Sequence, residues 1–81
     1  MTLEILTPDK KVFEGDVTTV TVPGTLGSFQ ILRGHAPIIS TLEDGQVIVK
    51  STTGENIFNI KGGVVEVLAN KIIVLAEAVV A

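Results

Sequence analysis

Glycine and other turn-forming residues recur at short intervals along this chain, and they leave room only for short strands between them. The turn signals are Pro8-Asp9, Glu14-Gly15-Asp16, Pro23-Gly24, Asp44-Gly45, Thr53-Gly54 and Gly62-Gly63. The segments between them are rich in β-branched residues, with 12 Val, 9 Ile and 9 Thr among 81, and such side chains suit a pleated sheet better than a helix. No stretch keeps an amphipathic 3.6-residue period with caps at both ends. The sequence therefore predicts an all-β fold, a sandwich or a barrel.

Alternating apolar and polar residues predict strands over residues 16–22, 46–50, 56–61, 64–69 and 71–76. In the second of these, Val47 and Val49 lie on the side opposite to Ile48. Gly62-Gly63 predicts a bulge or a corner, and Asn70, which tolerates the left-handed conformation, predicts a tight turn. The run Ile72-Ile73-Val74 is apolar on both faces. That pattern is typical of strands covered on both sides or lying against another subunit.

The composition is unusually apolar for so short a chain. Hydrophobic residues make up 46% of it and charged residues 19%, and the mean hydropathy is +0.54. A single domain of this size buries roughly 60–65% of the surface of its unfolded chain, so an apolar patch should stay exposed and mark a partner surface. No apolar run approaches the length of a membrane helix, and no signal peptide pattern is present. We expect a soluble cytoplasmic domain without direct membrane insertion.

Several functional classes are disfavoured by the residues that the chain lacks. Without Cys there is no disulfide scaffold, zinc ribbon or thiol nucleophile. The net charge is −3, the basic residues are scattered, and Tyr and Trp are absent, so no nucleic acid partner is expected. Glu43-Asp44 supplies too few oxygen ligands for calcium. Gly24-Thr25-Leu26-Gly27 lacks the Lys-Ser/Thr of a phosphate loop and is interpreted as a tight exposed loop. We therefore expect neither a metal nor a cofactor.

Two chemical alternatives stay open at this point. His35 could act as a general base for Ser28 or Ser40, but no nucleophile elbow surrounds either serine. Lys71, beside the turn residue Asn70, could carry biotin or lipoate as in small all-β carrier domains. In those domains, however, the lysine lies near the middle of two similar halves, whereas Lys71 lies ten residues from the end of this sequence.

Two segments of the chain resemble the hallmarks of the epsilon subunit of F-type ATP synthases. The first resembles the family's glycine–His–Ala–Pro loop, and the second its Gly-Gly, strand, turn and strand ending in Leu-Ala. The opening of the chain and the Phe13-Glu14-Gly15 turn also fit, so that the resemblance covers residues 3–78. The segments are Gly27-Ser28-Phe29-Gln30-Ile31-Leu32-Arg33-Gly34-His35-Ala36-Pro37-Ile38-Ile39, Lys61-Gly62-Gly63-Val64-Val65-Glu66-Val67, Asn70-Lys71-Ile72-Ile73-Val74-Leu75-Ala76 and Leu3-Glu4-Ile5-Leu6-Thr7-Pro8.

The resemblance implies a single domain over residues 1–81, built as a flattened sandwich of two five-stranded sheets. It also implies a non-catalytic rotor subunit of the central stalk, peripheral to the cytoplasmic face of the bacterial inner membrane, which links the gamma subunit to the c-ring and couples ion-driven rotation to ATP synthesis. Carried over by position, the gamma-facing surface includes Thr7, His35 and Ser40. The loop facing the c-ring comprises Pro23, Gly24, Thr25, Leu26, Gly27 and Ser28.

The chain departs from the family pattern in two respects. Where many relatives have Pro-Gly-His, this chain has Arg33-Gly34-His35, so a rigid proline is replaced by a cation at the expected gamma boundary. The family's C-terminal helical hairpin is also absent. That hairpin carries the inhibition of ATP hydrolysis and, in some members, an ATP site, so we expect this chain to have neither.

Overall fold

The computed structural model describes residues 1–80, which contain eight β-strands and no helix. The predicted all-β class is confirmed. The strands are β1 (Thr2–Leu6), β2 (Lys11–Asp16), β3 (Thr19–Val22), β4 (Phe29–Leu32), β5 (Ile38–Leu42), β6 (Gly45–Ser51), β7 (Gly54–Leu68) and β8 (Lys71–Val80).

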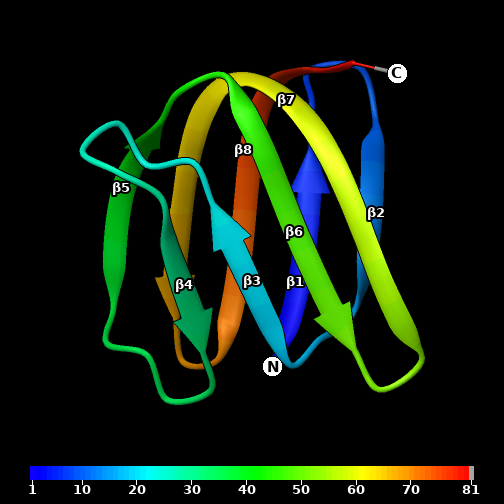
Figure 1. Ribbon diagram of the computed structural model, residues 1–81, viewed down its shortest axis with the longest axis vertical. Helices are drawn as coiled ribbons and strands as arrows, with labels where there is room; N and C mark the ends of the chain where they lie inside the picture. Colours follow the sequence, from blue (N-terminus) through cyan, green and yellow to red (C-terminus); the bar gives the residue numbers. More distant parts are fainter. Residues whose placement is uncertain (81) are drawn as a thin grey trace.

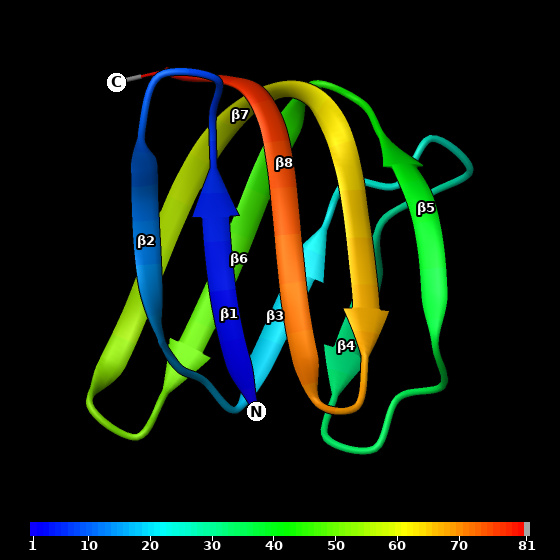
Figure 2. The same cartoon turned by 180° about the vertical axis from the view of Figure 1, so that it is seen from behind.

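The strands are arranged in two layers that face each other (Figure 1). The front layer contains β4, β3, β6 and the first part of β7, and residues 78–80 of β8 pair with this part of β7. The back layer, which faces the viewer in Figure 2, contains β5, the second part of β7, the first part of β8, β1 and β2. The extents of 27 × 27 × 19 Å are those of a flattened body.

The expected pair of separate five-stranded sheets is wrong in number, because one hydrogen-bonded network joins both layers. Its order is β2-β1-β8-β7-β6-β3-β4, with β5 pairing β7. β7 and β8 pass from one layer into the other, so each contributes a segment to both. The predicted strands 56–61 and 64–69 are accordingly the two parts of β7. The predicted strand 16–22 begins only at Thr19, because the peptide N–H groups of Val17 and Thr18 donate outside the ladder, to Met1 and Lys50.

The corner of β7 lies at Gly62 and Gly63, as the sequence predicts. Their φ angles are +48° and +143°, values that residues with a Cβ rarely adopt. A Cβ on Gly63 would also overlap the carbonyl oxygen of Leu75 on the neighbouring strand. Asp44 secures the corner from the β5–β6 turn, because its carboxylate accepts the Gly62 N–H at 2.8 Å and lies 3.9 Å from Lys61 Nζ.

The core between the layers is wholly apolar among the residues that the structure describes. Val47 and Val49 are buried and Ile48 faces outward, which confirms the predicted alternation. Phe13 of the back layer and Phe58 of the front layer meet edge to face, with their centroids 5.6 Å apart. The buried side chains are Leu3, Ile5, Val17, Val20, Val22, Ile31, Leu42, Val47, Val49, Ile60, Val65, Val67, Ile72, Val74 and Ala76.

Replacing Gly63 with alanine should lower the free energy of unfolding by about 3 kcal/mol or more, since backbone strain is added to a steric overlap. Gly54 is the matched control, because its φ is +150° but no atom would lie within 4 Å of a Cβ added there. Gly54→Ala should cost about 1–2 kcal/mol. Urea denaturation of both variants measures the difference, and equal losses would show that the overlap at the corner is not what constrains β7.

Candidate partner-binding surfaces

The outer face of the back layer carries a cluster of exposed apolar side chains. Residues with buried neighbours on either side, such as Leu75 between Val74 and Ala76, must point outward from a pleated strand. Ile39, Leu68 and Leu75 are 72%, 58% and 50% exposed. We call this surface the apolar face; it consists of Leu6, Ile39, Val64, Leu68, Ile73 and Leu75, contributed by β1, β5, β7 and β8.

Charged side chains border the apolar face on the side of β1 and β2. Glu4 is only 19% exposed, and its two carboxylate oxygens each lie 3.5 Å from a lysine, Lys11 or Lys71. Lys11 also contacts Glu14 at 3.0 Å. The hydrogen bond to Glu14 and the negative charges of Glu14 and Glu4 raise the pKa of Lys11. Exposed ion pairs of this kind add little stability, so their main effect here is a fixed pattern of charge beside an apolar surface.

The outer face of the front layer is more polar. Its larger apolar side chains include Ile57 on β7, which is 50% exposed, Leu32 on β4 and Val80 on β8. Ile57 is paired directly with the outward-facing Ile48 of β6. The other positions around these residues in the front layer are polar or charged: Thr19, Thr21, Gln30, Gln46, Lys50, Glu55, Asn59 and Lys61. The two faces therefore differ in chemistry, and the back layer carries the predicted exposed apolar patch.

Thr7, His35 and Ser40 lie around the back layer rather than in one cluster. Thr7 follows the end of β1, Ser40 lies on the edge strand β5, and His35 lies in the loop between β4 and β5, at the opposite end of the sandwich from Thr7 (Figure 2). The order of neighbouring strands in the back layer is β5, β7, β8 and β1, so β5 and β1 are about 14 Å apart at the usual strand spacing. Only a partner that spans the layer could contact all three residues.

Two of these side chains have structural roles that the sequence does not reveal. The Thr7 hydroxyl donates to the Lys10 carbonyl at 3.2 Å and accepts the Lys10 N–H at 3.3 Å, and so closes the β1–β2 turn. Ser40 pairs with the buried Val65 and shares its inward side, where it is half-buried and its Oγ donates to the Thr41 carbonyl at 3.4 Å. The outward positions of β5 are Ile39 and Thr41. No local signal distinguishes the two sides of so short a strand.

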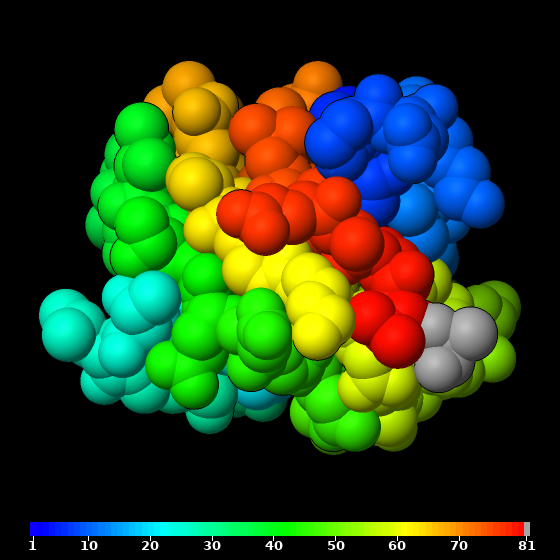
Figure 3. Space-filling model, turned by 90° about the horizontal axis from the view of Figure 1, so that it is seen from above, coloured from blue at the N-terminus to red at the C-terminus, as the bar shows by residue number. Residues whose placement is uncertain are grey.

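The segment Pro23–Ser28 lies near the end of β5 and protrudes sideways from the edge of the sandwich, as Figure 3 shows in cyan. Pro23 and Gly24 are buried, whereas Thr25 to Ser28 are exposed and Leu26 is fully so. The interpretation of residues 24–27 as a tight exposed loop is thus confirmed for Thr25 to Gly27, whereas Gly24 is buried at the base of the loop. An apolar side chain at the tip of a loop has no packing role in the folded chain.

The base of this loop is firmly held. Gly24 bridges Leu42 of β5, Thr25 donates its N–H to the Thr41 carbonyl at 3.1 Å, and the two threonine hydroxyls lie 2.8 Å apart. A Cβ on Gly24 would lie 2.7 Å from the Gly27 carbonyl oxygen and 2.8 Å from the Phe29 ring. The loop is therefore a stiff projection on which Leu26 is carried.

The structure offers no catalytic arrangement around His35. The ring Nδ1 lies 2.7 Å from the Ala36 carbonyl, and no hydrogen bond joins His35 to Ser28 or Ser40.

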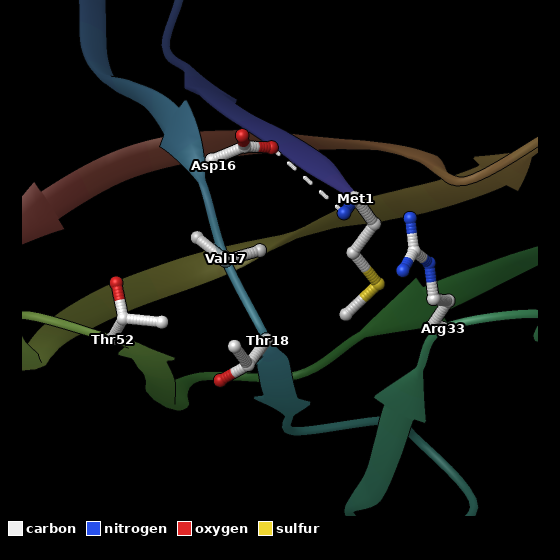
Figure 4. Close-up of a pocket in the computed structure, with 6 residues that line it drawn as sticks. All are labelled: Met1, Asp16, Val17, Thr18, Arg33 and Thr52. Carbon is white, nitrogen blue, oxygen red and sulfur yellow. Dashed lines mark ion pairs between the residues drawn. The ribbon is translucent and has the colours of Figure 1, made fainter.

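A hollow of about 380 Å³ near the start of β1 is lined by Met1, Asp16, Val17, Thr18, Arg33 and Thr52 (Figure 4). The Met1 amino group lies 3.8 Å from Asp16 Oδ1 there. Arg33, which replaces the proline of many relatives, lines the same hollow beside the N-terminus.

Other kinds of site are also missing from the part of the chain that the structure describes. Residues 1–80 contain no group of three or more acidic, His or Cys side chains that could hold a metal ion. They also contain no helix that could cross a membrane. Lys71 lies in β8, opposite Leu68 and beside Thr2 of β1, with Nζ 3.5 Å from Glu4. It belongs to a paired strand and an ion network, not to the tip of a turn.

Comparison with known proteins identifies one family over the whole chain. Residues 1–81 match the family model described as ATP synthase, Delta/Epsilon chain, beta-sandwich domain. The ATP synthase epsilon chain of Chlorobium limicola is 47% identical over 78 residues, which cover 95% of this chain and 89% of that protein. The epsilon chain of Chlorobaculum tepidum is 46% identical and is covered to 90%, whereas that of Desulfatibacillum aliphaticivorans, also 46% identical, is covered to 55%.

Solved structures agree on the fold. A chain of the Euglena gracilis mitochondrial ATP synthase, from a structure of OSCP, F1 and the c-ring, superposes with a TM-score of 0.89 at 21% identity, covering 96% of this chain and 51% of that chain. A chain from the central stalk and c-ring of the Tetrahymena thermophila enzyme gives 0.85 at 20% identity, covering 99% and 65%.

The family match favours neither a carrier role for Lys71 nor a hydrolase role for His35. The relatives are structural subunits of the ATP synthase and have no catalytic role of their own. The family resemblance that rests on the two sequence hallmarks is confirmed. This chain belongs to the family of ATP synthase delta/epsilon chains and forms the β-sandwich domain of an epsilon chain.

Proposed function

We propose that this chain is a rotor subunit of the central stalk of an F-type ATP synthase, linking the gamma subunit to the c-ring so that ion-driven rotation is coupled to ATP synthesis. It would lie at the cytoplasmic face of a bacterial inner membrane as a peripheral subunit. The observation that carries the proposal is the combination of one apolar layer face with a stiff apolar-tipped loop at one edge of the same body. Two partners can thus be held by one rigid domain.

The apolar face is the proposed gamma-binding surface. Ile39, Leu68 and Leu75 expose half or more of their surface in the free chain, and burying the remaining surface of such side chains contributes about 1–2 kcal/mol each before the costs of association are subtracted. Thr7 and His35 lie at opposite ends of this face, so one partner lying across the layer would reach both. Ser40 lies on the edge strand β5 with its side chain inward, so this partner would meet Ser40 only by extending over the edge of the layer. The contact residues expected from the family and the apolar chemistry of the surface thus both favour the back layer as the gamma-binding side of the sandwich.

Glu66 adds a charge requirement to this interface. It is paired in register with Ile39 on one side and Ile73 on the other, so its exposed carboxylate lies within the apolar face. Among residues 1–80 no ion pair is formed by Glu66. A carboxylate covered without a partner destabilises a complex strongly. The gamma surface is therefore expected to present a lysine or arginine opposite Glu66.

The loop Pro23–Ser28 is the proposed contact with the c-ring. A subunit that transmits torque must not bend at its point of contact, and the bonds from Thr25 to Thr41 and the bridge from Gly24 to Leu42 hold the loop on β5. Leu26 then supplies an apolar tip for a ring loop. The single network of strands adds stiffness, because β7 and β8 connect the layer that carries gamma to the other layer.

Leu75→Glu should weaken binding to the gamma subunit at least about 30-fold, since an unpaired charge at an interface costs about 2 kcal/mol or more. Ile57→Glu is the matched control, because Ile57 is equally exposed on the outer face of the other layer. Isothermal titration of both variants against gamma measures the difference. If Ile57→Glu lost more affinity than Leu75→Glu, the face assignment would be wrong.

Leu26→Ser should weaken association with membrane sectors that contain the c-ring by about tenfold, because one buried leucine is lost from the contact. It should leave gamma binding and thermal stability unchanged, since the Leu26 side chain is fully exposed in the free chain. Leu32→Ser, on an exposed apolar residue of β4, serves as the control. Sedimentation of reconstituted gamma–epsilon complexes with c-ring liposomes measures the association. Equal retention of both variants would remove Leu26 from the ring contact.

A further inference from the structure

One hydrogen bond connects the turn between β7 and β8 to the loop that carries His35. The N–H of Gly34 donates to the Oδ1 of Asn70 at 2.9 Å, across 36 residues of sequence. The loop 33–37 makes two other hydrogen bonds within residues 1–80, and both are local: His35 N–H to the Leu32 carbonyl, and His35 Nδ1 to the Ala36 carbonyl. The Asn70 side chain is thus the loop's hydrogen-bonded link to the back layer.

The turn itself does not require asparagine at position 70. Ala69 and Asn70 have φ angles of +50° and +62° and connect the paired residues Leu68 and Lys71. A two-residue hairpin with two positive φ angles favours glycine at its second position, because glycine adopts that conformation without steric cost. The backbone carbonyl of Asn70, which accepts the Thr2 N–H at 3.0 Å, would be the same in glycine. The Oδ1 bond to Gly34 is what only the side chain supplies.

The turn and the loop border the same part of the surface. Figure 2 shows the turn after β7 and the loop before β5 side by side at one end of the back layer. Next to them, over the start of β5 and the end of β7, is an open hollow of about 500 Å³ lined by Pro37, Ile38, Ile39, Glu66, Val67 and Leu68. Leu68 directly precedes the turn and Pro37 ends the loop. Any shift of the loop relative to the turn therefore changes the shape of this corner of the apolar face.

We propose that Asn70 is a positioning residue, which fixes the β4–β5 loop on the β7–β8 turn and so sets the place of His35 beside the gamma-binding surface. This inference rests on the proposed function for its partner, but the coupling of turn and loop belongs to the chain itself. Arg33-Gly34-His35 lacks the proline that would stiffen the loop from within. The bond from Asn70 supplies the restraint from outside.

Three variants separate positioning from folding. Asn70→Gly keeps the turn conformation and removes the Oδ1 acceptor, so the melting temperature should stay within a few degrees of the wild type. Asn70→Asp keeps an acceptor oxygen in the same place. Ala69→Gly relieves a positive φ in the same turn and leaves the bond to Gly34 intact, which makes it the matched control.

The first readout is amide hydrogen exchange of Gly34 in the free chain. Loss of one neutral hydrogen bond should speed exchange about fivefold in Asn70→Gly. Ala69→Gly should exchange as the wild type does, and Asn70→Asp should exchange no faster, because a carboxylate accepts a stronger hydrogen bond. The second readout is affinity for gamma, which should fall about fivefold in Asn70→Gly alone. Unchanged Gly34 exchange in a folded Asn70→Gly variant would overturn the coupling, and faster exchange with unchanged gamma affinity would overturn the positioning role.

The two hypotheses fail in different ways. If the wild-type chain did not bind gamma, the proposed function would fail, and with it the gamma part of this inference, whereas the Gly34 exchange rates would still decide whether Asn70 holds the loop. If the wild type bound gamma and Leu75→Glu did not, an Asn70→Gly variant with unchanged Gly34 exchange or unchanged gamma affinity would overturn this inference and leave the proposed function standing.

Discussion

The bend of β7 at Gly62 and Gly63 is the feature on which the rest of the molecule depends. One long strand that turns a corner serves both layers, so that the strands form a single hydrogen-bonded network. The corner requires a residue without a Cβ, because the carbonyl oxygen of Leu75 fills the space that a side chain would occupy. β8 follows β7 around the corner, and β1 pairs with β8. The relative placement of the two layers is thus fixed through the backbone.

This construction explains why the two outer faces differ. The sandwich is only 19 Å thick along its shortest axis, so a single apolar layer fills the interior and the remaining apolar side chains must lie outside. They gather on the back layer, over β5, β7, β8 and β1, whereas the front layer is mostly polar outside. An apolar face on a stiff sheet suits a permanent partner, and a projecting loop at the edge of the same body suits a second one.

Local sequence patterns were sufficient for much of the fold and for less of the surface. Alternation places Val47 and Val49 inside, and the Gly-Gly pair and Asn70 mark a corner and a turn, because each of these features depends on near neighbours. The sharing of β7 and β8 between layers depends on pairing across the chain, and so does the inward side of Ser40. The bond between Asn70 and Gly34 joins residues 36 positions apart. Family resemblance supplied the proposed partners, which no pattern of residues indicates alone.

The central claim is that this domain is held by the gamma subunit. Its most direct test is co-expression of the chain with the gamma subunit of the same enzyme, followed by size-exclusion chromatography with light scattering. A stoichiometric one-to-one complex, stable through the column, is the predicted result. A chain that is folded by circular dichroism yet elutes alone, with gamma in a separate peak, would contradict the claim and limit the family likeness to the fold.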